Sequence, residues 1–240
     1  TAINLAAVAA FCIVVASPAL VSSSCATPQT EQEDTTIIRE DLGITALKYS
    51  SPEVPSSIEF CGKVIDLSRF DRHERMDREL LAFTYMHSTS LQMLKKANRY
   101  FPIVEPILKE NGIPDDFKYL MVIESNMNPT ARSSAGAAGL WQFMQGTGRD
   151  YGLEVNNNVD ERYHIEKATR AACRYLKDAY AKYKDWVAVA ASYNAGQARI
   201  ASQLAKQDVD DSLDLQLVEE TARYVYLSLI HISEPTRLGM

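Results

Sequence analysis

One glutamate ends a segment that is otherwise almost entirely apolar. Glu124 closes the run Phe117-Lys-Tyr-Leu-Met-Val-Ile-Glu, and the apolar residues at positions 117, 120 and 121 share its helix face. Burial among apolar side chains raises the pKa of a carboxyl group, and the negative end of the helix dipole acts in the same direction. A carboxyl group that stays protonated near neutral pH can protonate a leaving oxygen, as cleavage of a glycosidic bond requires. The alternative is a glutamate that turns to solvent at the helix end or pairs with an arginine.

Three later segments carry polar side chains where packing alone would favour apolar ones. Gln142 interrupts the run Leu-Trp-Gln-Phe-Met, Tyr193 and Asn194 interrupt an alanine-rich helix, and Tyr224 follows a Glu-Glu-Thr segment. Each of these, taken singly, is explained by a hydrogen-bonded core residue. Together they supply carboxyl, amide and phenol groups of the kind that line a sugar-binding cleft.

In their order along the chain, these segments resemble the catalytic domain of the lytic transglycosylases of glycoside hydrolase family 23. The likeness runs from about Phe70 to Tyr226. Its motifs are Glu124-Ser125, then Ser133, Gly136, Ala137, Gly139, Leu140 and Gln142 with Met144 after them, then Tyr193-Asn194-x-Gly196, and last Glu220-Thr221-x-x-Tyr224-Val225.

The resemblance implies a lysozyme-like helical fold and cleavage of the β-1,4 bond between N-acetylmuramic acid and N-acetylglucosamine in peptidoglycan glycan strands. It implies that Glu124 acts first as the acid on the glycosidic oxygen and then as the base that closes a 1,6-anhydro ring. The same resemblance implies the substrate-binding roles. Asn194 and Tyr224 would hold the acetamide, Ser133 and Gln142 would bind sugar polar groups, Tyr193 would shape the floor, Met144 would give an apolar contact, and Ser125 completes the first motif.

Glycosidases usually employ two carboxylates, and the resemblance implies only one here. The sequence is compatible with this, because no acidic residue follows Glu124 until Asp150. Two alternatives stay open. One is a hydrolytic muramidase similar to goose-type lysozyme, and the other is a non-catalytic wall-binding module on the same scaffold.

The elements that must position these residues are predicted to be helices throughout, so the fold class is all-α. A helix is expected from Arg72 to about Leu94, and a second from Phe101 to Glu110, opened by Pro102. Later helices are expected at 114–126, 137–151, 165–183, 185–206 and 214–228, and a short extended segment at 58–68.

The N-terminal part of the chain predicts export. Residues 1–25 contain no charged residue and include an apolar run typical of a signal peptide, which we expect to be truncated at its start. Ser-Ser-Ser-Cys25 loosely resembles a lipoprotein box, so an outer-membrane lipid anchor at Cys25 is a candidate, with a periplasmic location. Residues 26–68 are expected to be a tether and 69–226 the catalytic domain, while 227–240 has the look of a translated sequencing adapter.

Composition and motifs argue against other classes of function. The net charge of −6 is unlike that of a nucleic-acid-binding protein. The four histidines are scattered without ligand spacing, and Gly136-x-x-Gly139 lacks the lysine of a phosphate-binding loop, so no metal and no cofactor is expected. An exported compartment would permit a disulfide between Cys61 and Cys173, but two cysteines alone do not establish one.

Overall fold

The computed structural model describes residues 52–84, 87–209 and 211–237, and side chains only outside 87–91 and 231–237. Its helices are α1 (Phe70–Thr84), α2 (His87–Glu110), α3 (Lys118–Ser125), α4 (Gln145–Asp150), α5 (Ile165–Tyr183), α6 (Trp186–Ala195), α7 (Gln197–Lys206) and α8 (Glu219–Arg237). Residues Asp115–Phe117, Glu161–Tyr163 and Ser212–Asp214 form short 3-10 helices. The expected all-α class is confirmed, with one small β-hairpin added. The predicted signal peptide, Cys25 and most of the predicted tether lie outside the described residues.

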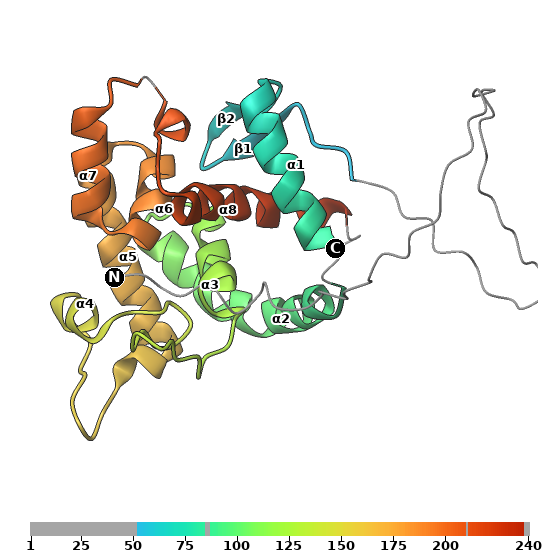
Figure 1. Ribbon diagram of the computed structural model, residues 1–240. Coiled ribbons are helices and arrows are strands. Elements are labelled where there is room, and N and C mark those ends of the chain that lie inside the picture. Colours follow the sequence, from blue (N-terminus) through green and yellow to red (C-terminus); the bar gives the residue numbers. More distant parts are fainter. Residues whose placement is uncertain (1–51, 85–86, 210, 238–240) are drawn as a thin grey trace, which may run out of the picture. The chain divides into compact units, whose positions relative to one another are not determined.

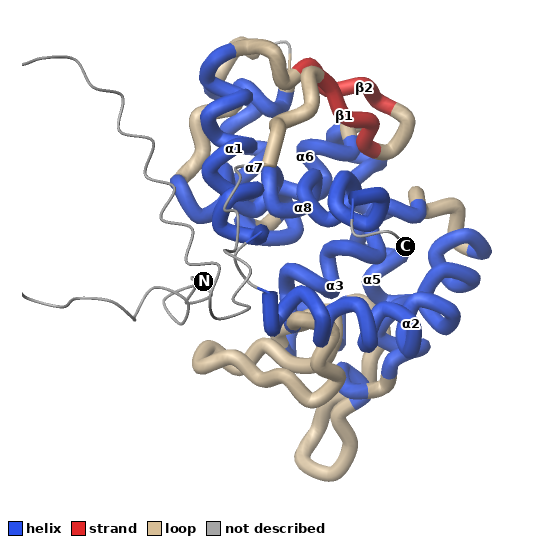
Figure 2. The backbone as a smooth tube through the Cα atoms, turned by 90° about the vertical axis from the view of Figure 1, so that its right-hand side faces the viewer, coloured by secondary structure: helices blue, strands red, loops and turns tan. Residues whose placement is uncertain are grey.

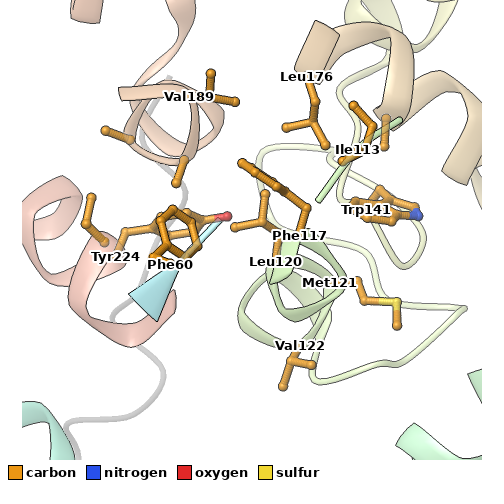
Figure 3. Packing of buried hydrophobic residues seen from close by; sticks show 14 of the residues in the cluster. Phe60, Ile113, Phe117, Leu120, Met121, Val122, Trp141, Leu176, Val189 and Tyr224 are labelled. Carbon is orange, nitrogen blue, oxygen red and sulfur yellow. The ribbon is translucent and has the colours of Figure 1, made fainter. Parts of the chain in front are cut away.

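Helix α8 occupies the centre of the helical domain. It packs against α1, α3 and α6, and Figure 1 shows it crossing the domain between α1 and α3. Its buried residues Tyr224, Val225 and Leu229 belong to the same hydrophobic core as the apolar residues of α3. Figure 3 shows Met121 and Val122 leaving α3 on different sides, as expected of a helix that is apolar nearly all round.

The hairpin closes one end of this core. Strands β1 (Ser57–Phe60) and β2 (Lys63–Asp66) form an antiparallel hairpin (Figure 2). Within it, Ile58 pairs with Ile65. Phe60 and Ile65 are almost completely buried, and β1 contacts α8. The end of the segment expected to be a tether is therefore packed into the domain, because its alternating apolar residues have a core to cover.

Four of the expected helices have other bounds in the structure. The helix expected from Arg72 to about Leu94 falls in α1, which ends at Thr84, and in the start of α2, which begins at His87. Pro102 lies inside α2 instead of opening a helix, because the buried residues Val104 and Leu108 hold that helix against α5 despite the missing amide hydrogen. Residues 137–144 form an irregular loop, and only α4 follows as a helix. The expected helix 185–206 is two helices, since Gly196 adopts φ +86° and ψ 141° between α6 and α7.

The remaining helices agree better with the sequence. Helix α5 has the expected bounds, and the helix expected from residue 114 begins as a 3-10 turn and ends at Ser125. Helix α8 starts at Glu219 and runs past residue 227, with Leu229 and Ile230 buried. The interpretation of 227–240 as adapter sequence stays a prediction. None of the helices in the described part of the chain is both long and apolar enough to cross a membrane.

Replacing Gly196 by alanine tests the break between α6 and α7. A Cβ at this position meets no atom within 4 Å, so the cost comes from the backbone conformation alone. We expect Gly196→Ala to lower the free energy of unfolding by about 1–3 kcal/mol in urea titrations. Gly146→Ala is the matched control, because Gly146 lies in α4 with equally open space. It should leave stability unchanged or raise it by about 0.5–1 kcal/mol. Equal stabilities for the two variants would contradict the assigned backbone conformation.

Candidate active site

Glu124 lies in the last turn of α3, where the helix ends at Asn126 in the left-handed conformation. The residue is half-buried, between the fully buried Met121 on its own helix and the packed surface of α8. Burial raises the pKa of Glu124 to about 7. The sequence-based expectation of a carboxyl group with a raised pKa at this helix end therefore agrees with the structure.

Tyr224 of α8 donates a hydrogen bond from its hydroxyl group to Oε1 of Glu124, over 2.8 Å. This bond stabilises the carboxylate and so works against the rise in the pKa of Glu124. Burial and the neighbouring carboxyl group hold the pKa of Tyr224 well above its usual value, so Tyr224 remains a phenol and a donor. Two residues that the resemblance placed in one site are thus in direct contact, although 100 positions separate them.

A second carboxylate acts on Glu124 from α8. The negative charge of Glu220 contributes to the raised pKa of Glu124. Glu220 lies four residues before Tyr224, and therefore one helical turn away on the same face of α8. The sequence analysis considered only the acidic residues that directly follow Glu124 and therefore did not identify Glu220 as a second carboxylate. The four-residue spacing between Glu220 and Tyr224 could have indicated it.

Tyr193 and Asn194 connect α6 to the other parts of the site. The Tyr193 hydroxyl group donates to the backbone oxygen of Trp141 over 2.8 Å, and the Asn194 side-chain oxygen accepts from the Thr221 hydroxyl group over 2.9 Å. Burial raises the pKa of Tyr193 well above its usual value, and the negative charge of Glu124 adds to this rise. Both tyrosines are therefore electrostatically coupled to the same carboxyl group.

A pocket of about 170 Å³ lies beside Tyr193. It brings together four of the expected substrate-binding residues, Gln142, Met144, Tyr193 and Asn194. Its complete lining is Trp141, Gln142, Phe143, Met144, Thr147, Tyr175, Tyr193, Asn194, Ala195 and Gly196. Four of the expected residues thus line this pocket, while Glu124 and Tyr224 are in contact with each other and Ser133 lies in neither group.

The loop 126–144 is held by polar contacts instead of regular secondary structure. Ser125 donates to the backbone oxygen of Leu140, over 3.0 Å. The Ser133 hydroxyl oxygen accepts from the amide of Ala137, and the Gln142 amide donates to the backbone oxygens of Ala131 and Gly139. In this structure, Ser133 and Gln142 therefore shape the loop, and their contact with sugar stays a prediction.

The side chain of Arg162 holds this loop in place through hydrogen bonds to its backbone. Its guanidinium group is almost fully buried, pairs with Asp160, and donates to the backbone oxygens of Gly136 and Phe143 at 2.8 and 2.9 Å. The backbone of Gly139 adopts φ +79° and approaches Arg162 so closely that a Cβ would lie 1.9 Å from the Arg162 carbonyl oxygen. The two glycines of this motif thus serve loop geometry, and sequence reasoning gave no signal for Arg162.

Histidine, cysteine and acidic side chains are the groups of the described residues that could hold a metal ion or, for cysteine, form a disulfide. No group of three or more histidine, cysteine, aspartate or glutamate side chains there could hold a metal ion. Cys61 and Cys173 are both free thiols.

Comparisons with known proteins agree with this geometry. Residues 102–214 match the family described as Transglycosylase SLT domain. The chain is 31% identical over 157 residues to membrane-bound lytic murein transglycosylase D of Escherichia coli, a match that covers 63% of this chain and 34% of that protein. It is 27% identical over 132 residues to peptidoglycan transglycosylase gp16 of phage T7, covering 54% of this chain and 10% of that protein.

Among solved structures, the chain resembles an inactive mutant of lytic transglycosylase Slt from Pseudomonas aeruginosa, at 23% identity and a TM-score of 0.48. That match covers 58% of this chain and 24% of the other. The chain spans about a third of the length of transglycosylase D. The expected resemblance to the transglycosylase family is confirmed by the match of residues 102–214 to the SLT domain.

The raised pKa of Glu124 predicts a pH-dependent stability. The folded protein binds this proton more tightly than the unfolded chain does, so stability falls as pH rises from the ordinary glutamate pKa towards about 7. Between pH 4 and pH 8, we expect the free energy of unfolding of the wild type to fall by up to about 3 kcal/mol relative to Glu124→Gln. Urea titrations at several pH values measure this. Glu110→Gln, at an exposed ion pair with Arg170, is the control and should follow the wild type.

The close approach at Gly139 predicts a specific loss in the loop. Gly139→Ala must displace the loop from the Arg162 backbone, and we expect a destabilisation of about 2–4 kcal/mol in thermal or urea unfolding. Hydrogen exchange should rise first at the amides of Gly136, Ala137 and Ala138. Unchanged exchange at these amides would argue against the packed loop, whatever the global stability.

Proposed function

We propose that the chain is a peptidoglycan lytic transglycosylase that cleaves the β-1,4 bond between N-acetylmuramic acid and N-acetylglucosamine. The observation that carries this proposal is the position of Glu124, whose pKa is raised to about 7 and whose carboxyl group contacts the phenol of Tyr224. The matches to a transglycosylase SLT domain and to transglycosylase D support the same activity.

In the proposed reaction, Glu124 donates its proton to the glycosidic oxygen as the bond to the muramyl C1 breaks. The carboxylate then takes the proton of the muramyl C6 hydroxyl group, whose oxygen closes a 1,6-anhydro ring on C1. No water is consumed, and Glu124 ends in its starting state. A pKa near neutrality suits a group that serves as acid and then as base, because neither step is then strongly uphill.

The other residues have supporting roles in this proposal. Tyr224 stabilises the Glu124 carboxylate between the two proton transfers, and the acetamide of the substrate takes the part of a second carboxylate, as the family resemblance implies. The pocket beside Tyr193 and Asn194 would receive a sugar ring, with Met144 as an apolar contact. The side-chain oxygen of Asn194 already accepts a hydrogen bond from Thr221, so the NH₂ group of Asn194 would donate to a carbonyl oxygen of the substrate.

Glu220 favours one alternative, a hydrolytic muramidase. Its charge influences Glu124, and a second carboxylate near the acid is what a hydrolase uses to activate water. The two reactions differ in product, because an anhydro product is lighter than the reducing-end product by one water.

The predicted location follows from the same proposal. A peptidoglycan substrate would place residues 69–226, the proposed catalytic domain, in the periplasm. The signal peptide at 1–25 and a lipid anchor at Cys25 fit that location and stay predictions.

Digestion of purified sacculi tests the function. We expect the wild type to release 1,6-anhydromuramyl products, identified by mass spectrometry, and Glu124→Gln to reduce the rate by about 10²–10⁴-fold, since it removes the acid and the base. Glu110→Gln should retain wild-type activity. Products ending only in reducing muramic acid would establish the hydrolase instead, and in that case Glu220→Gln should abolish them. Equal rates for wild type and Glu124→Gln would overturn the proposal.

A further inference from the structure

A second glutamate of the domain is more deeply buried than Glu124. Glu79 of α1 is 1% exposed. A carboxylate at such a depth is costly unless it is paired and hydrogen-bonded. Glu79 belongs to none of the motifs that carry the family resemblance.

The partner of Glu79 is Arg223 of α8. Nε of Arg223 donates to Oε1 of Glu79 over 2.6 Å, and Nη2 donates to Oε2 over 2.9 Å. Arg78 adds a third contact, from its Nε to Oε1 over 3.1 Å. A two-point pair between a planar guanidinium group and a carboxylate fixes orientation as well as distance. It therefore locks the side of α8 that faces α1.

Arg223 immediately precedes Tyr224, so α8 is held at two adjacent residues that point in different directions. Successive side chains on a helix are about 100° apart around its axis. Arg223 reaches α1, while Tyr224 reaches α3 and donates to Glu124. These two attachments define the rotation of α8 about its own axis.

That rotation matters because the tyrosine hydroxyl group lies far from the axis. At a distance of roughly 9 Å from the axis, a rotation of about 10° moves the hydroxyl oxygen by roughly 1.5 Å. Such a shift would lengthen the 2.8 Å contact with Glu124 beyond the range of a hydrogen bond.

We propose that Glu79 is a positioning residue for the proposed active site, which acts through Arg223 by fixing the rotation of α8 and thereby keeping the Tyr224 hydroxyl group on the Glu124 carboxylate. Its consequence for catalysis rests on the proposed function, but its consequence for the proton of Glu124 does not.

The sign of the change in the pKa of Glu124 separates positioning from simple electrostatics. The groups that act on Glu124 are Tyr224 and Glu220 from α8, and Tyr193 from α6 is coupled to it in turn. Loss of the Tyr224 hydrogen bond raises the pKa of Glu124, because that bond favours the carboxylate. Removal of the negative charge of Glu79, with no movement of Tyr224, would lower the pKa or leave it unchanged.

Carboxyl ¹³C NMR titration of the protein labelled at glutamate tests this, with Glu124 assigned by its loss in Glu124→Gln. We expect Glu79→Gln to raise the pKa of Glu124 by roughly 0.5–1, the equivalent of one hydrogen bond. Tyr224→Phe should raise it by a similar amount. The double variant should raise it no further than Tyr224→Phe alone, because the first substitution acts through the tyrosine.

Glu219→Gln is the matched control. It breaks the exposed pair between Arg78 and Glu219, which joins the same two helices over 2.8 Å. We expect no change in the pKa of Glu124, since an exposed pair of this kind contributes little.

Arg223→Lys provides a second variant in case Glu79→Gln does not fold, as circular dichroism would show. Lysine keeps the charge but loses the two-point contact, so the pKa of Glu124 should again rise. On sacculi, both variants should lower kcat about tenfold with little change in KM, as expected for a displaced catalytic group.

The two proposals can fail separately. A wild type without activity on sacculi would remove the proposed function, and the NMR titration would still decide on Glu79. An unchanged or lowered pKa of Glu124 in folded Glu79→Gln, or in Arg223→Lys where only that variant folds, would overturn the positioning role.

Discussion

The hydrogen bond between Tyr224 and Glu124 is the contact on which the site depends, because it joins two helices that are 100 residues apart in sequence. It requires the C-terminal end of α3 to meet the first turns of α8. Helix α8 therefore lies at the centre, with α1, α3 and α6 packed around it. The buried apolar residues of α3 pack in the core, and Glu124 near the end of that helix finds its hydrogen-bond donor on α8.

The loop 126–144 is positioned by hydrogen bonds rather than by the packing of helices. Its backbone has little regular structure, and turn-type backbone hydrogen bonds within the loop are supplemented by side-chain contacts from Arg162, Gln142 and Ser133. The requirement that buried polar groups find partners explains the polar residues in this apolar run. Packing gives the reason for Gly139, because the Arg162 backbone occupies the space of its Cβ.

Periodicity predicted much of the fold, and its failures have physical causes. The bounds of α5 and the apolar character of α3 follow from local spacing, which a sequence shows directly. The course of α2 through Pro102 depends on packing against α5, and the irregular path of 137–144 depends on Arg162. Both are long-range effects that no local pattern contains. Motif order predicted residues that the structure brings into contact, such as Glu124 and Tyr224, but it pointed to neither Glu79 nor Arg162, because a buried ion pair has no periodic pattern in the sequence.

The protonation of Glu124 is the net result of opposing contributions. Burial and the charge of Glu220 favour the neutral acid, while the Tyr224 hydroxyl group favours the carboxylate. The pKa of about 7 means that burial and the charge of Glu220 together outweigh the hydrogen bond, and the two side chains involved, Tyr224 and Glu220, lie one turn apart on α8. A small movement of that helix changes both at once. The orientation of α8 therefore influences the protonation of Glu124 as well as the packing of the domain. In the proposed role of Glu79, its buried pair with Arg223 fixes that orientation.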